Sequence, residues 1–171
     1  MSATTLEALN RMDADAYTEK LGGIYEHSPW VAARTAAGRP YAGIAELHAA
    51  MQMAVKVASR AEQLALIRAH PQLMGKLASP GELTESSRRE QAAAGLDRCS
   101  PSQLAQLRDF NKAYQERHCF PFIVAVRGLS TDEVIAAMGA RIVNNTEQEF
   151  QACLQQIGRI ARLRLDELVS G

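Results

Sequence analysis

Apolar residues recur at intervals of three and four positions along nearly the whole chain, which is the spacing of one face of an α-helix. Residues with high helix propensity, such as Ala, Leu, Glu, Gln and Arg, are abundant, whereas aromatic residues make up only 5% of the 171 positions. Apolar residues amount to 47% and charged residues to 22%, as in ordinary globular proteins. We therefore predict an all-α fold, a compact single-domain bundle of about eight or nine helices spanning residues 1–171.

Capping residues and prolines divide this pattern into separate helices. Asp13, Thr84 and Thr131 carry the short polar side chains that favour N-caps. Pro71 requires a helix end near residue 70, because proline disfavours the α conformation in the residue before it. A turn is predicted at residues 79–81. The predicted helices cover residues 14–26, 29–37, 44–58, 60–69, 85–94, 101–114, 132–143 and 146–168.

One segment, Phe120-Pro121-Phe122-Ile123-Val124-Ala125-Val126, departs from the helical pattern. It is continuously apolar and rich in β-branched residues, so it suits either a buried extended segment or the start of a buried helix, and periodicity does not decide between them. A single strand without a partner makes no sheet. We expect one apolar non-helical segment near residues 120–127.

The charge balance gives no electrostatic reason to expect a nucleic-acid or membrane partner. Lys and Arg together number 19, and so do Asp and Glu, so the chain has no net attraction for phosphates or anionic lipids. No apolar run approaches the ~20 residues of a spanning helix, and the N-terminus lacks the features of a signal peptide. The three scattered cysteines and the four histidines show no disulfide or metal-ligand spacing. We expect a cytoplasmic protein with reduced thiols and no metal.

His70 is the first of three positions that break local rules and are therefore candidate site residues. It closes one predicted helix directly before Pro71. A helix C-terminus favours a cationic imidazole, which suits a proton donor. The alternative is a histidine that serves only as a helix cap.

Ser87, Glu90 and Gln91 are the second candidate. Their spacing places a hydroxyl, a carboxylate and an amide on one face of a single helix. Such a face can hold a small polar molecule through several donors and acceptors. The alternative is an ordinary solvated helix face.

Arg164 is the third candidate, because it falls on the apolar stripe of the last predicted helix. A guanidinium that faces a core is costly unless it meets an anion. That anion is either Glu90 or a carboxylate of a substrate. The alternative is a side chain that extends to the surface at a frayed helix end.

Taken together in order, the motifs of the chain resemble one enzyme family. They are His70-Pro71-x-Leu73, Leu83-Thr84-x-x-Ser87-x-x-Glu90-Gln91, Gly95-Leu96, Phe120-Pro121-Phe122 with Ala125-x-Arg127, and Arg162-Leu163-x-Leu165. This ordered set resembles 2-oxo-4-hydroxy-4-carboxy-5-ureidoimidazoline (OHCU) decarboxylase. The resemblance covers nearly the whole chain.

The resemblance implies a cofactor-independent, homodimeric enzyme of urate degradation that decarboxylates OHCU to (S)-allantoin and CO2. It implies that His70 is the essential acid and that Glu90 and Arg164 are the other catalytic groups. The implied substrate-binding residues are Pro71, Ser87, Glu90, Gln91 and the backbone of Phe122, Ile123, Val124, Ala125 and Val126.

Two departures from the family pattern and two competing functions stay open. His118-Cys119 stands where the family commonly has Phe-Gly, which affects the shape of the turn into Phe120 because glycine's backbone freedom is lost. Gly128 stands where another residue is common.

The competing functions are a non-catalytic helical module that binds a small purine catabolite, and a structural helix bundle that offers surfaces to partners.

Overall fold

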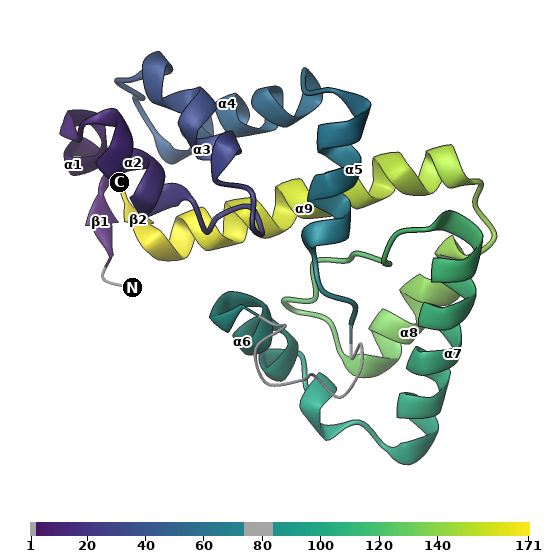
Figure 1. The fold of residues 1–171 in the computed structure, drawn as a ribbon. Helices are drawn as coiled ribbons and strands as arrows, with labels where there is room; N and C mark the ends of the chain where they lie inside the picture. The colour runs from purple at the N-terminus through teal and green to yellow at the C-terminus, as the bar shows by residue number, and fades with distance from the viewer. Residues whose placement is uncertain (1–2, 74–83) are drawn as a thin grey trace. The chain divides into compact units, whose positions relative to one another are not determined.

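The computed structural model describes residues 3–73 and 84–171, and in these residues the predicted all-α class is confirmed (Figure 1). The α-helices are α1 (Leu6–Arg11), α2 (Ala14–Leu21), α3 (Pro29–Thr35), α4 (Ile44–Lys56), α5 (Arg60–Ala69), α6 (Glu85–Ala93), α7 (Pro101–His118), α8 (Thr131–Arg141) and α9 (Thr146–Leu168). Two short 3-10 helices, η1 (Ala36–Gly38) and η2 (Leu96–Arg98), and two short strands, β1 (Thr4–Thr5) and β2 (Val169–Ser170), complete the described elements. Within the described ranges, no helix has the length and apolar character needed to cross a membrane.

The helix boundaries follow the capping and proline signals closely, with a few differences. The predicted helix after Asp13 ends at Leu21 rather than at residue 26, because two glycines follow and glycine weakens a helix. The N-cap of α8 is Ser130, one residue before the predicted cap, and it forms a reciprocal capping box with Glu133. The sequence pattern did not indicate α1 or the two strands. The turn predicted at residues 79–81 lies outside the described residues.

The chain divides into two compact units, residues 1–69 with 158–171, and residues 70–157. Helix α9 contributes residues to both units. The prediction that residues 1–171 form a single domain stays a prediction.

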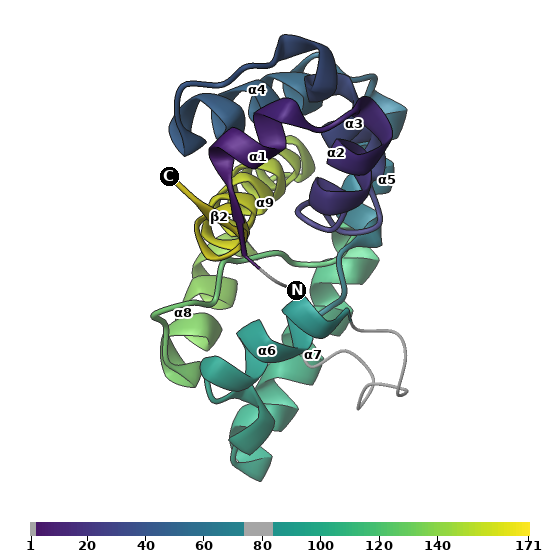
Figure 2. The same cartoon turned by 90° about the vertical axis from the view of Figure 1, so that its left-hand side faces the viewer.

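The first unit brings the first and last strands, β1 and β2, together (Figures 1 and 2). β1 pairs with β2 in parallel, with Thr4 opposite Val169. Helix α2 packs on α3, and α3 packs on α4. The amphipathic faces of α1 to α4 bury large side chains, which include Leu9, Tyr17, Leu21, Val31, Leu47 and Met51.

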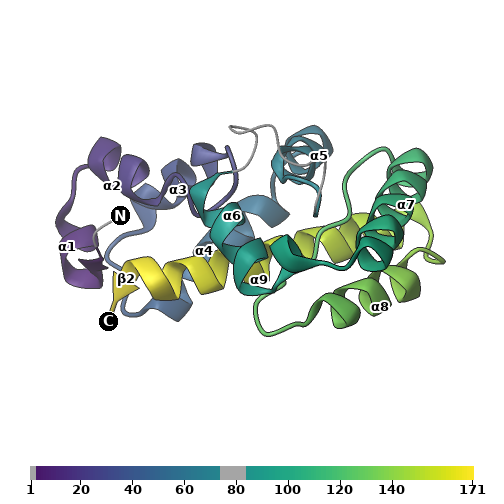
Figure 3. The same ribbon diagram turned by 90° about the horizontal axis from the view of Figure 1, so that it is seen from below.

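In the second unit, α7 and α8 lie side by side (Figure 3). Its core is aromatic: the Tyr114 ring meets the edges of Phe120 and Phe122 at centroid distances of 6.0 and 5.3 Å, and Phe120 meets Phe150 at 6.1 Å. Edge-to-face contacts of this kind stabilise beyond the apolar area that they bury. Tyr114 and Phe150 therefore hold the two phenylalanines of the irregular segment.

Residues 121–126 form neither helix nor strand, which confirms the predicted non-helical segment. Phe122 and Ile123 are almost completely buried. The turn into the segment is made by Cys119, which ends α7 with φ 61° and ψ 24°. This is the left-handed region, which a residue with a Cβ adopts at a cost. The backbone here keeps a glycine-like conformation although the residue is cysteine.

Replacing Cys119 by Gly is expected to raise the free energy of unfolding by about 1 kcal/mol, because the left-handed backbone then carries no Cβ penalty. Urea denaturation of native protein and variant measures the change. Cys119→Ala is the matched control, because it removes the thiol and keeps the Cβ, and it should give no gain. An equal gain in both variants would mean that the thiol, rather than the backbone, is the destabilising feature.

Candidate functional site

His70 lies at the start of the second unit, directly after α5 ends at Ala69. Its side chain is 6% exposed, and the predicted helix end before Pro71 is confirmed. Helix α7 holds the chain that follows: the Asn111 side-chain amide donates to the Leu73 carbonyl at 2.5 Å. One turn further along α7, Gln115 accepts from Gln72 at 3.4 Å. The imidazole therefore sits on a bend that is held by side chains of a neighbouring helix.

The polar face of α6 is turned inward rather than toward solvent. Ser87 and Gln91 are 5% and 8% exposed, and Ala94 continues the same buried face. Glu90 is partly buried. Thr84 caps the helix as predicted, accepting from the Ser87 amide at 3.2 Å. The solvated-face alternative does not fit this burial, because the exposed side of α6 carries a different set of charged residues.

The irregular segment receives its hydrogen bonds from side chains of α8 and α9. Arg141 donates from Nη1 to the Ile123 carbonyl at 2.6 Å, and its guanidinium lies over the Phe122 ring at 4.3 Å. The Ala125 amide donates to Gln156 Oε1 at 3.0 Å. These contacts supply the partners that a helix or sheet would otherwise give to the backbone.

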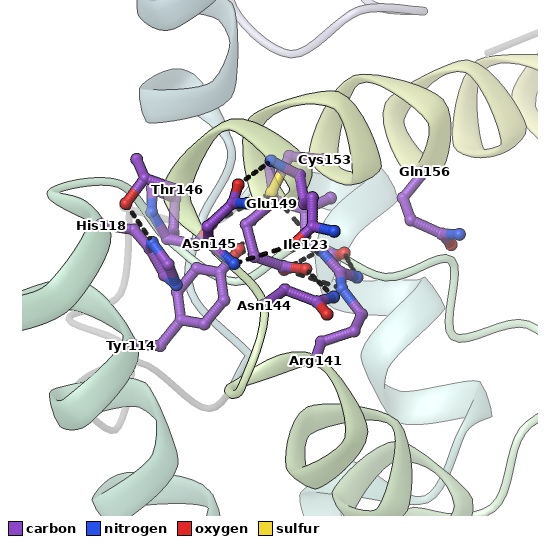
Figure 4. Close-up of polar contacts among 12 residues, drawn as sticks. Tyr114, His118, Ile123, Arg141, Asn144, Asn145, Thr146, Glu149, Cys153 and Gln156 are labelled. Atoms are coloured by element: carbon purple, nitrogen blue, oxygen red, sulfur yellow. Dashed lines mark hydrogen bonds and ion pairs between the residues drawn. The ribbon is translucent and has the colours of Figure 1, made fainter.

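Glu149 is the most completely buried carboxylate near this segment, with a side chain that is 0% exposed (Figure 4). Its Oε1 accepts from Arg141 Nε at 2.9 Å and from the Tyr114 hydroxyl at 2.6 Å. Its Oε2 accepts from Asn144 at 2.8 Å. Burial would raise the pKa of Glu149, but the hydrogen bonds from Arg141, Asn144 and Tyr114 outweigh it and hold the pKa below its ordinary value. The carboxylate therefore stays ionised inside the unit.

Burial also shifts the pKa values of the titratable groups around Glu149. Burial raises the pKa of Tyr114 and of the Cys153 thiol, so both stay protonated. Burial, with the nearby positive charge of Arg117, lowers the pKa of His118. His118 Nδ1 lies 2.8 Å from Thr146 Oγ1, and within the described part of the chain its buried Nε2 has no hydrogen-bond partner. His118 is therefore a neutral core histidine, stacked on Phe120.

Arg164 is buried in the first unit, with 5% of its side chain exposed, which decides between the two alternatives that the sequence left open. It does not extend to the surface. Its Nη1 donates to Glu26 Oε2 at 2.7 Å, and Glu26 is 1% exposed. Sequence reasoning missed Glu26, because the helix was expected to run to that residue, where a carboxylate would normally be solvated. The glycines before it were the one signal of an earlier helix end.

The predicted site residues are distributed over the two units. His70, Pro71, the α6 face and residues 122–126 belong to the second unit, whereas Arg164 belongs to the first. Their convergence on one substrate stays a prediction. Among residues 3–73 and 84–171, no group of three His, Cys, Asp or Glu side chains is placed to hold a metal ion.

Comparison with known proteins identifies the family. A sequence model described as OHCU decarboxylase matches residues 10–166. The chain is 43% identical to a 2-oxo-4-hydroxy-4-carboxy-5-ureidoimidazoline decarboxylase of Haloferax volcanii, over 99% of both chains. The chain belongs to the OHCU decarboxylase family. It is also 40% identical to a bifunctional uric acid degradation protein of Bacillus subtilis, covering 97% of this chain and 33% of that protein.

A solved structure agrees with this assignment. The fold is similar to the crystal structure of an (S)-allantoin synthase, with a TM-score of 0.80 and 30% sequence identity. The similarity covers 97% of this chain and 54% of that one, so the chain spans about half the length of the synthase. The resemblance inferred from the motifs is confirmed at the level of the family.

Replacing Glu26 by Gln is expected to lower the free energy of unfolding by about 3 kcal/mol, because Arg164 then keeps a buried charge without its carboxylate partner. Urea denaturation measures the loss. Glu7→Gln is the matched control: Glu7 pairs with Arg11 on the surface, where both side chains are more than 70% exposed, and its loss should be almost undetectable. Equal losses in the two variants would show that burial does not make the Glu26 pair important.

Proposed function

We propose that the protein catalyses the cofactor-independent decarboxylation of 2-oxo-4-hydroxy-4-carboxy-5-ureidoimidazoline to (S)-allantoin and CO2 in urate degradation. The observation that carries the proposal is the full-length similarity to a relative of that name, together with an inward-facing His70 and an inward-facing polar surface on α6. The proposed substrate is a small anion of urate breakdown. The proposed setting is the cytoplasm, with the chain acting as a homodimer.

The substrate explains why no cofactor is required. Its carboxylate is on a carbon that also bears a hydroxyl, next to a ring carbon double-bonded to nitrogen. That imine accepts the electron pair left when CO2 departs, so the ring supplies its own electron sink. The protein has to orient the ring, exclude water and place one proton.

The roles of the second unit follow from this chemistry. Loss of CO2 leaves an enol-like intermediate, and His70 delivers a proton to one face of it, which gives a single enantiomer. Glu90 and Gln91 hold the ureido N–H and C=O groups, and Ser87 and Pro71 line the pocket. The backbone of residues 122–126 pairs with the flat amide groups of the ring. The burial of Ser87 and Gln91 supports this arrangement.

Arg164 is the proposed third catalytic group. The motif resemblance implies that Arg164 is a catalytic group, and its proposed role is to pair with an anionic group of the substrate or to orient Glu90. The buried Glu26 carboxylate supports this role, because it holds the charge of the guanidinium inside the unit: Nη1 donates to Glu26, and the carbonyls of Gly23 and Ile24 lie 3.4 Å from the same nitrogen.

Replacing His70 by Asn is expected to lower the rate of (S)-allantoin formation by about a hundredfold or more, the usual contribution of a positioned proton donor. The measurement is the optical activity of allantoin formed from freshly generated substrate. His27→Asn is the control, because His27 is exposed with φ 45° and Asn tolerates that backbone. It should keep the native rate.

Two outcomes would contradict the proposal. Near-native turnover by the His70 variant would remove His70 from the proton transfer. A native protein that binds the substrate without producing optically active allantoin would favour the alternative, a non-catalytic binding module for a purine catabolite.

A further inference from the structure

We propose that Glu149 and Arg141 are positioning residues for the proposed reaction: the Glu149 carboxylate orients the Arg141 guanidinium, which fixes the backbone of residues 122–126 for substrate binding. This inference rests on the proposed function, and it names two residues that the motifs did not single out. Neither residue touches the substrate in this proposal; both act through the irregular segment.

The first argument is the geometry of the guanidinium. Arg141 Nε donates to Glu149 Oε1 at 2.9 Å. Nη2, on the same edge of the guanidinium, lies 2.8 Å from that oxygen and donates to Cys153 Sγ at 3.6 Å. A guanidinium is planar, so fixing this edge also fixes the direction of Nη1. Nη1 donates to the Ile123 carbonyl at 2.6 Å (Figure 4). The position of the carbonyl thus depends on a carboxylate that does not contact the segment.

The second argument is that Glu149 itself is rigidly held. Tyr114 and Asn144 donate to it at 2.6 and 2.8 Å, in addition to Arg141. Charge-assisted hydrogen bonds in a buried environment are stronger and more directional than neutral ones. The carboxylate is therefore a fixed point between α7, α8 and α9.

The third argument links this fixed point to His70. Tyr114 and Asn111 are three residues apart on α7, so they lie on the same side of that helix. Asn111 holds the carbonyl of Leu73, three residues after His70. The same helix therefore fixes the bend that carries the proposed acid and, through Glu149, the segment that carries the proposed ring-binding backbone.

The test compares three variants by steady-state kinetics at a temperature where all are folded. Glu149→Gln keeps the shape and removes the charge. Arg141→Lys keeps the charge but lacks the planar fork that serves both Glu149 and Ile123. Val134→Ala is the control, because Val134 is fully buried on α8 and its truncation creates a cavity without removing any atom of these hydrogen bonds.

The positioning role predicts that Glu149→Gln and Arg141→Lys raise KM for the substrate, and the dissociation constant of (S)-allantoin, by about tenfold, the loss expected for one weakened hydrogen bond. kcat should change less. In both variants, amide hydrogen exchange should accelerate in peptides covering residues 121–127. Val134→Ala should lower the melting temperature without moving KM.

The inference is wrong if both variants melt earlier, as Val134→Ala does, while KM and the dissociation constant stay within twofold of native. It is also wrong if exchange accelerates in residues 121–127 without any change in binding. If Glu149→Gln fails to fold, Arg141→Lys decides alone. A native chain that forms no optically active allantoin refutes the proposed function instead, which separates that failure from this one.

Discussion

The ionised carboxylate of Glu149, enclosed in the second unit, is the constraint on which the arrangement of that unit depends. A buried charge is costly unless donors surround it, and Arg141, Asn144 and Tyr114 provide them. Because these donors come from different elements, α7, α8 and the chain before α9 have to meet at one place. The irregular segment is then held by Nη1 of Arg141, the donor that does not face Glu149.

The first unit contains a second buried ion pair. Arg164 and Glu26 are both almost completely buried, so the polar groups of each unit are organised by an arginine and a carboxylate. In the proposed reaction the substrate supplies its own electron sink. The protein orients the substrate, excludes water from it and donates one proton. Rigid charge pairs suit that task, because they hold flexible polar groups in one orientation at low entropic cost during binding.

Much of the fold could be predicted from local patterns. The end of α5 and the start of α6 follow from Pro71 and from the Thr84 cap. The apolar stripe marked Arg164 as a candidate, but only the structure decided that it is buried. The burial of Ser87 and Gln91 could not be settled in this way, because a polar helix face has the same spacing whether it faces solvent or a pocket. At Cys119 the residue type is misleading in the other direction: the backbone adopts a left-handed turn that cysteine does not favour.

Helical periodicity, capping residues and an apolar run with a proline are properties of short stretches of chain, so the primary structure alone indicated most of the helices, the non-helical segment and the family. The partners of the buried charges are a different matter. Glu26 and Arg164 are 138 positions apart, and Tyr114 and Glu149 are 35 apart. No local signal marks such pairs, because the residues next to a buried Glu in the sequence do not differ in kind from those next to a solvated one. Only the packed chain, which excludes water from particular places, determines which charged side chains are buried and form ion pairs.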